Sequence, residues 1–158
     1  MNILNEADLA EYLKEKKVWF RMMERETTVH TAEDAAATGI PLEKIVKSLV
    51  FVDENKIPVL VIIPGNCVVN KERLKKFLGV KSVKLASFEE AEEYSGYPPG
   101  ATPPVCHKIE KVVMDEKIFE HESVVGGGGS TNKLIEMKSE DIKKLNNALV
   151  ANIAEKVK

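Results

Sequence analysis

The chain has 158 residues, of which 44% are hydrophobic and 30% charged, with a formal net charge of −2 at pH 7. These values predict one globular domain with its own core, and they argue against an intrinsically disordered chain, a DNA-binding protein or a general nucleic-acid coat. The same charge and composition are compatible with a small local contact to one nucleic-acid end. No apolar run approaches the roughly 20 residues of a membrane span, and the first residues lack signal-peptide features, so we expect a cytoplasmic protein without a membrane partner.

The first half of the chain predicts two helices and a hairpin. Asn5 begins a helix with acidic residues in its first turn, and Thr31 caps a short alanine-rich helix that ends before a turn over 42–46. Two apolar, β-branched runs, 48–52 and 58–63, then flank a polar tetrapeptide, which is typical of a β-hairpin. Because both runs are almost continuously apolar, we expect central strands that are covered on both faces.

The second half alternates helices and strands. Asn70 caps a basic helix that ends near Gly79, and Ser87 caps an acidic helix after a strand at 81–85. A glycine run at 126–129 interrupts the later strands, and Ser139 caps a terminal helix to about Val157. The later strands are expected at 112–114, 118–119, 123–125 and 133–137. The pattern predicts a single α+β domain over 1–158, with a mixed, mostly antiparallel sheet flanked by helices.

The segment 96–105 carries four prolines and two glycines. Proline fixes φ and removes a backbone donor, whereas glycine allows positive φ and close backbone approach, so this segment is expected to be a stiff loop. It holds no obvious nucleophile. The loop therefore either acts through its shape and backbone dipoles or is a rigid connection between two elements.

The rest of the chain does not match familiar catalytic or metal-binding motifs. The segment 126–131 lacks the Lys-Ser/Thr of a phosphate-binding loop and the final glycine of a nucleophile elbow, so it is either a turn whose amides approach a ligand or a hairpin turn. Cys106 and His107 are adjacent, and Cys67 has no paired ligand spacing, so we expect no metal and no cofactor. His30 and His121 also lack that spacing. The two cysteines imply no disulfide framework; buried small hydrophobes fit them better than a redox or nucleophilic pair.

Lysines offer the remaining chemistry. Lys47 stands at the entrance of an apolar strand, where its ammonium either extends into solvent or points into a cleft as a partner for phosphate or a developing oxyanion. A second basic group is either a solvated face or a contact for a nucleic-acid backbone. It comprises Lys71, Arg73, Lys75, Lys76, Lys81 and Lys84.

Taken together, these segments resemble the YbaK / prolyl-tRNA-synthetase-associated domain family of aminoacyl-tRNA deacylases. The matching pieces occur in the family's order at 31–36, 46–50, 96–104 and the late glycine run, and they cover roughly residues 25–150. Two departures stand out. Cys106-His107 follow the loop where relatives often have an aromatic residue and Gly-His, and the glycine run has one extra glycine.

The resemblance implies hydrolysis of the ester that joins a wrongly attached amino acid to the tRNA 3′ end. It further implies that the terminal ribose hydroxyl, or the thiol of a cysteine substrate, helps to activate the attack. It assigns catalytic roles to Lys47 and Gly100. Substrate contacts are implied for His30, Thr31, Ala101, Thr102, Pro103, Pro104, Gly127, Gly128 and Ser130.

The resemblance favours a small amino acid, alanine or cysteine, on proline tRNA, and leaves serine, threonine and other tRNAs open. The implied partners are the acceptor end of a mischarged tRNA and a synthetase. Two other classes compete with the enzyme. One is a catalytically silent module that binds a tRNA end, a nucleotide or a synthetase. The other is a redox or metal protein, which would need Cys67 and Cys106 close together.

Overall fold

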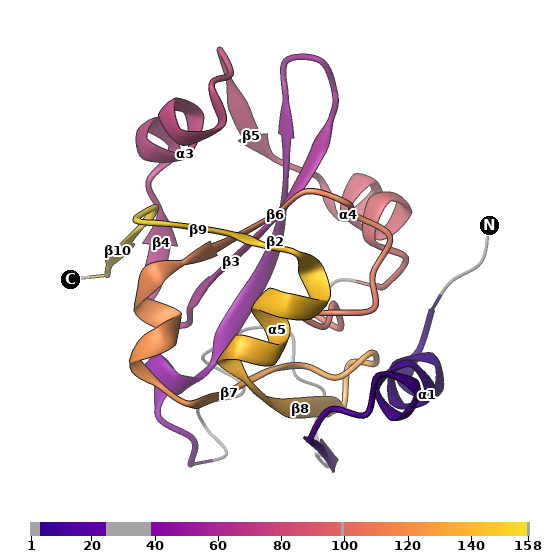
Figure 1. The fold of residues 1–158 in the computed structure, drawn as a ribbon. Coiled ribbons are helices and arrows are strands. Elements are labelled where there is room, and N and C mark those ends of the chain that lie inside the picture. The colour runs from indigo at the N-terminus through magenta and orange to yellow at the C-terminus, as the bar shows by residue number, and fades with distance from the viewer. Residues whose placement is uncertain (1–3, 25–38, 99, 158) are drawn as a thin grey trace.

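The computed structural model describes residues 4–24, 39–98 and 100–157. Its largest sheet has five strands in the order β5-β2-β3-β6-β9 (Figure 1). β2 and β3 form the predicted antiparallel hairpin, with Val46 opposite Pro64 and Val52 opposite Pro58. β6 is parallel to β3 and β9 is parallel to β6, so this sheet is mixed. The strands are β2 (Val46–Asp53), β3 (Pro58–Pro64), β5 (Val83–Leu85), β6 (Val112–Asp115) and β9 (Leu149–Ala151).

Two smaller antiparallel sheets complete the strands of the described chain. One has the order β1-β8-β7 and the other pairs β10 with β4. A single parallel bridge between Ile45 and Val125 joins the three-stranded sheet to the start of β2. The mixed α+β architecture predicted from the sequence is confirmed. These strands are β1 (Phe20–Glu24), β4 (Cys67–Val69), β7 (Ser123–Gly127), β8 (Lys133–Lys138) and β10 (Ala154–Lys156).

Side-chain caps determine where three of the helices begin, as predicted. Asn5 and Ser87 each form a capping box with the third helical residue, and Asn70 accepts a hydrogen bond from the Arg73 amide. The helix predicted after Thr31 lies outside the described residues. Each helix in the described ranges is too short or too polar to pass through a lipid bilayer. The α-helices are α1 (Glu6–Lys16), α3 (Lys71–Leu78), α4 (Phe88–Ser95) and α5 (Ser139–Asn146), and the 3₁₀ helices are η1 (Leu42–Lys44) and η2 (Glu116–Glu120).

Three predictions about the C-terminal third are wrong. The residues 118–119, expected to form a strand, belong to η2, because the Asp115 carboxylate accepts the Lys117 amide and starts a helical turn. The terminal helix α5 ends at Asn146, not near Val157. Asn147 takes the left-handed conformation (φ 50°), which asparagine tolerates, and β9 and β10 follow. Ser139 is also not the cap: its hydroxyl donates to the His121 carbonyl.

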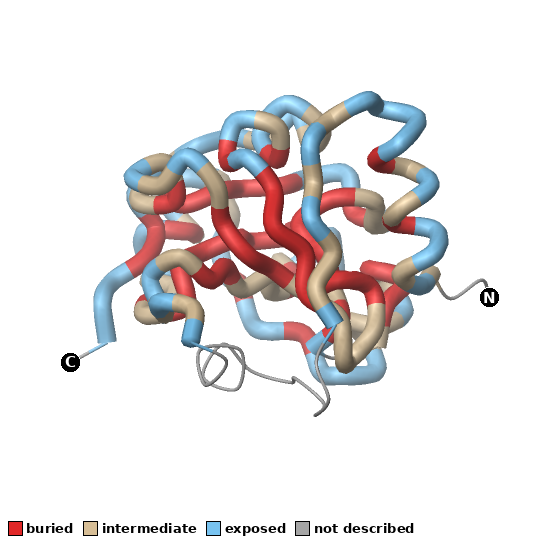
Figure 2. The backbone as a smooth tube through the Cα atoms, turned by 90° about the horizontal axis from the view of Figure 1, so that it is seen from below, coloured by how far each residue is buried: buried red, intermediate tan, exposed pale blue. Residues whose placement is uncertain are grey.

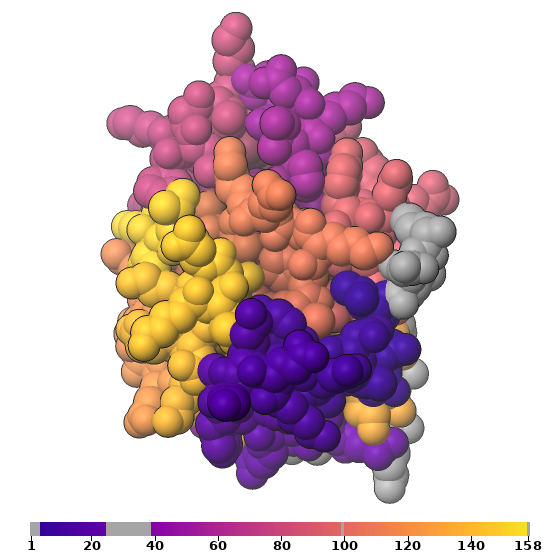
Figure 3. Space-filling view, turned by 45° about the vertical axis from the view of Figure 1, so that its right-hand side comes forward, coloured from indigo at the N-terminus to yellow at the C-terminus, as the bar shows by residue number. Residues whose placement is uncertain are grey.

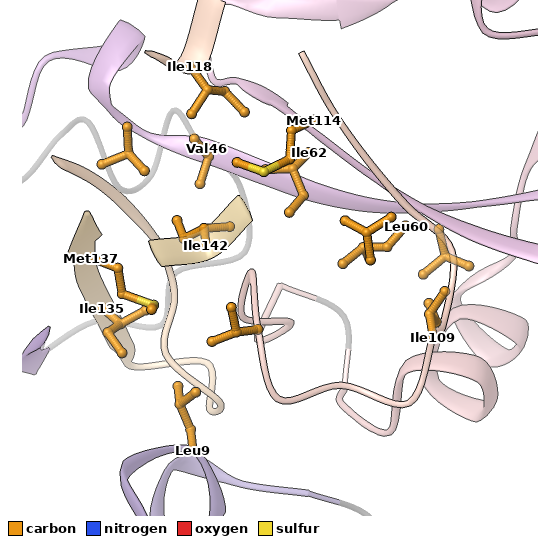
Figure 4. Packing of buried hydrophobic residues seen from close by; sticks show 14 of the residues in the cluster. Leu9, Val46, Leu60, Ile62, Ile109, Met114, Ile118, Ile135, Met137 and Ile142 are labelled. Carbon is orange, nitrogen blue, oxygen red and sulfur yellow. The ribbon is translucent and has the colours of Figure 1, made fainter. Parts of the chain in front are cut away.

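Hydrophobic residues cover both faces of the large sheet, as the apolar runs predicted. Along β3, Leu60 and Ile62 belong to one buried cluster, while Val61 and Ile63 belong to a second cluster on the other face. Figure 4 shows the first cluster, in which side chains of β2, β3 and β6 meet those of β8 and α5. The buried backbone runs through the centre of the molecule, with exposed residues around it (Figure 2).

Helix α1 closes one side of the first cluster. Leu9 and Leu13 are fully buried in it, and the Leu4 amide donates to the Gly96 carbonyl at 2.7 Å. Figure 3 shows α1, in indigo, lying against segments from the middle and the end of the chain. The helix thus packs beside the proline-rich segment.

Candidate active site

The proline-rich loop is held against the glycine run. Gly100 has a φ of 81°, a conformation that favours glycine, and Ala101, Pro103 and Pro104 are buried. The Gly129 amide donates to the Ala101 carbonyl at 2.9 Å. The fold therefore brings together two segments that the sequence singled out separately.

Close backbone packing explains the glycines. A Cβ on Gly127 would lie 2.5 Å from the Thr102 carbonyl oxygen, a distance that no side chain tolerates. A Cβ on Gly128 would lie 2.8 Å from the backbone of Lys133 across the turn. A Cβ on Gly129 would lie 2.8 Å from the backbone of Glu6 in α1. The glycine run is therefore a close-packed support for the loop, with Gly126 and Gly127 forming the end of β7.

Lys47 lies beside this contact but points away from it. Val46 and Pro104 both approach Gly126, so the loop meets β2 one residue before Lys47. Side chains alternate along β2, and the Lys47 ammonium donates to the Cys67 carbonyl at 2.9 Å, towards the second core cluster. In this conformation the ammonium and the loop lie on opposite faces of β2, and the catalytic role of Lys47 stays a prediction.

Lysines gather around Lys47, together with the buried carboxylate of Asp115, which lies 3.5 Å from the Lys117 ammonium. Burial raises the pKa of the Cys67 thiol above its usual value; Asp115 adds to that rise, and nearby ammonium groups oppose it. These ammonium groups belong to Lys117, Lys47 and Lys156. A cavity of about 200 Å³ opens here, and its lining combines two of these lysines with two carboxylates. The lining residues are Glu43, Pro64, Asn66, Lys117, Glu120, His121 and Lys156. Lysines and carboxylates thus lie side by side at this end of β2.

Hydrogen bonds hold Cys106 and His107, the two residues that depart from the family pattern. Tyr97 is buried, and its hydroxyl donates to the Cys106 carbonyl at 2.6 Å. Burial raises the pKa of the phenol, and the neighbouring Cys106 thiol adds to that rise. Cys106 has a φ of 60°, so the chain turns sharply after the loop. The His107 imidazole contacts Asn146 at 2.8 Å. The sequence assigned no role to Asn146, because the terminal helix was expected to continue to about Val157 and Asn146 would then lie inside it.

Neither competing chemistry finds support among the described residues. Cys67 packs in the second core cluster and Cys106 against the first, so the two free thiols lie on opposite faces of the large sheet. Within residues 4–24, 39–98 and 100–157, no three His, Cys, Asp or Glu side chains are grouped to hold a metal ion. Ser130 donates to Asn132 in the turn after the glycines. His30 and Thr31 lie outside the described residues.

Comparison with known proteins decides the family. Residues 26–145 match the model of the aminoacyl-tRNA editing domain. The chain belongs to that family. The resemblance noted from the sequence is thereby confirmed: the family is one of aminoacyl-tRNA editing domains.

Relatives of this aminoacyl-tRNA editing domain fall into two groups. Proline–tRNA ligases match over part of their length: that of Thermosipho melanesiensis is 37% identical over 105 residues, which cover 66% of this chain and 18% of the ligase. The chain spans only 16% to 18% of the length of seven such ligases. A candidate Cys-tRNA(Pro)/Cys-tRNA(Cys) deacylase of Enterococcus faecalis is 28% identical over 130 residues, covering 80% of this chain and 79% of that protein.

Solved structures confirm the fold of the domain. The crystal structure of a hypothetical protein is 32% identical, with a TM-score of 0.87 over 94% of this chain and 99% of that one. The structure of a candidate trans-editing enzyme for prolyl-tRNA synthetase is 26% identical, with a TM-score of 0.83 over 95% of this chain and 96% of that one. The editing domain thus closely matches two other chains along nearly their whole length.

Proposed function

We propose that this editing domain acts in trans to hydrolyse the ester of a mischarged aminoacyl-tRNA, with alanine or cysteine on proline tRNA as its substrate. The observation that carries the proposal is the contact of the Gly100–Pro104 loop with Gly127 and Gly129, which fixes a stiff backbone segment in place. The relatives among proline–tRNA ligases and the candidate Cys-tRNA(Pro) deacylase support the choice of tRNA.

The proposed reaction needs no nucleophilic side chain from the protein. Water attacks the ester carbonyl carbon, the bond from that carbon to the ribose oxygen breaks, and the ribose oxygen receives the proton that the water loses. The neighbouring ribose hydroxyl, or the thiol of a cysteine substrate, helps to activate the attack. Because the ester is already reactive, positioning and stabilisation of the oxyanion can supply the acceleration. The buried, close-packed loop suits that role, with Gly100 and its neighbours orienting the aminoacyl group.

Lys47 serves the nucleic-acid side of the substrate in this proposal. Its side chain leaves the Cys67 carbonyl and turns towards the loop when substrate binds, so that its ammonium holds the terminal nucleotide or polarises the ester. The nearby Lys117 and Lys156 add positive charge at the same end of β2. A lysine suits this role because its compact charge sits on a flexible four-carbon stem that can turn towards a bound phosphate. The exchange of one partner, the Cys67 carbonyl, for a phosphate would strengthen the interaction electrostatically.

A deacylation panel tests the function. Alanine, cysteine, serine and proline are each charged on proline tRNA, and hydrolysis is followed with the wild type, Lys47→Ala and the control Lys14→Ala, which removes an exposed lysine of α1. We expect hydrolysis of the alanyl or cysteinyl ester. Lys47→Ala should slow it on the order of 100-fold with the fold intact, because a cationic contact to the reacting end is lost.

Each arm of this panel can contradict a separate part of the proposal. Unchanged turnover in Lys47→Ala would refute the role of that lysine. Hydrolysis of the serine ester alone would move the substrate to another small amino acid. If the wild type hydrolyses no ester in the panel, the domain is a catalytically silent module that binds a tRNA end, a nucleotide or a synthetase.

A further inference from the structure

A chain of hydrogen bonds runs from the end of α5 to the end of the loop. Asn146, the last residue of α5, donates from Nδ2 to the Pro104 carbonyl at 2.7 Å and to the Ile142 carbonyl at 2.9 Å. Its Oδ1 lies 2.8 Å from Nε2 of His107. Both polar atoms of the Asn146 amide, Nδ2 and Oδ1, are therefore hydrogen-bonded within the protein.

His107 determines which way this amide points. The Ile109 amide donates to Nδ1 of His107 at 3.2 Å, so Nδ1 carries a lone pair and the ring proton sits on Nε2. Burial lowers the pKa of His107, which favours this neutral ring. Because Nε2 donates, Asn146 must present its oxygen to His107 and its NH₂ group to Pro104. The imidazole thus orients the donor that reaches the loop.

The two ends of the loop are fixed by different parts of the chain. At one end the Gly129 amide binds the Ala101 carbonyl, and at the other end Asn146 binds the Pro104 carbonyl. Only Thr102 and Pro103 lie between these two anchored residues, and the Thr102 carbonyl is packed against Gly127. A small rotation of the Pro104 peptide would therefore move the short segment in which we place the aminoacyl group.

We infer that His107 and Asn146 are positioning residues for the deacylation reaction, acting through the Pro104 carbonyl to hold the Gly100–Pro104 loop in its productive shape. This inference rests on the proposed function, since it takes the loop as the place where the aminoacyl group binds. Neither side chain needs to contact the substrate. A displacement of about 1 Å at a reacting group can cost on the order of 100-fold in rate, which makes such support consequential.

Asn146→Asp and Asn147→Asp form the decisive pair of variants. Both make the same chemical change, but only Asn146 bonds to Pro104, whereas Asn147 is exposed at the helix end. We expect Asn146→Asp to lower kcat about 10- to 100-fold with KM within about twofold, since the loop orients the ester and does not bind the tRNA body. Asn147→Asp should leave both constants unchanged.

A second pair tests His107 through rescue. His107→Gln keeps an N–H donor near the position of Nε2, whereas His107→Leu removes it. We expect His107→Leu to lower kcat as Asn146→Asp does, and His107→Gln to recover most of the loss. Equal activity of the two variants, or a loss that appears only in KM, would overturn it.

Amide hydrogen exchange at Ala101 and Gly129, measured on the free protein, separates this inference from the proposed function. Faster exchange in Asn146→Asp than in Asn147→Asp supports the anchoring of the loop even if the wild type deacylates no tested ester, a result that would refute the proposed function alone. Unchanged exchange overturns the inference whatever the activity. Faster exchange with an unchanged kcat also overturns it, because the loop would then be anchored without consequence for the reaction.

Discussion

At the candidate site, the absence of a side chain at Gly127 allows the loop to pack against β7. Gly127 lies where β7 passes under the loop, and a Cβ there would come within 2.5 Å of the Thr102 oxygen. The sequence identified the glycine run as a segment that could approach a ligand. The structure instead uses Gly127 to bring one backbone segment against another, a contact that no local pattern reveals because its partner is about 25 residues away in the chain.

Gly127→Ala should displace the loop. The added methyl group overlaps the Thr102 carbonyl, so we expect a loss of about 1–3 kcal/mol in the free energy of unfolding and a large loss of deacylation, measured by urea denaturation and by turnover. Gly79→Ala is the matched control. It meets no atom within 4 Å but adopts φ 70°, so it should cost about 1–2 kcal/mol without affecting turnover. Equal turnover in the two variants would contradict the role given to Gly127.

Among the elements, those with a local signal were predicted well and those set by distant partners were not. Asn5, Asn70 and Ser87 begin their helices as expected, because a cap acts on amides two or three residues away. The strands β9 and β10 were predicted as helix. Their short segments contain little alternation, and β9 forms because β6 offers it a parallel edge. The same limit applies to the site, since Asn146 and the Cys67 carbonyl are recognised only through their partners.

Buried Asp115 organises the link between β9 and β10. Its Oδ1 accepts the amides of Ile153 and Ala154 at 3.0 Å each, and its Oδ2 accepts the Lys117 amide. Asp115→Asn replaces one accepting oxygen with an NH₂ group, so we expect a loss of about 1–3 kcal/mol in the free energy of unfolding. Amide exchange at Ile153 and Ala154 should accelerate. Glu116→Gln changes the neighbouring exposed carboxylate and should alter neither quantity; an equal effect of both variants would refute this role of Asp115.

On the scale of the whole molecule, charge is unevenly placed. The chain carries a net charge of −2, yet the ammonium groups of Lys47, Lys117 and Lys156 gather near Cys67, with the buried Asp115 carboxylate as a single counter-charge beside Lys117. The net charge follows from the sequence, but the grouping of the three lysines does not, because they come from β2, η2 and β10. We expect the tRNA acceptor end to bind where these positive charges meet.

Salt should therefore weaken substrate binding in a way that depends on these lysines. We expect the KM for the aminoacyl-tRNA to rise with salt, and the slope of log KM against log salt to fall by about 0.7 in Lys156→Gln, which is the value for one lost contact to a single strand. Lys111→Gln removes an exposed lysine that is not among the three, and should keep the wild-type slope. The same slope in both variants would place the tRNA elsewhere.

The pairing of β10 with β4 also affects how the domain folds during its synthesis. Lys156 lies opposite Cys67, whose carbonyl receives the Lys47 ammonium, and the Val157 amide donates to Asn66. During synthesis on the ribosome, the first 150 residues emerge before the strand that completes this corner. The nascent domain therefore has an open strand edge at β4 until β10 emerges, and during that period a chaperone or a second nascent chain could pair with it.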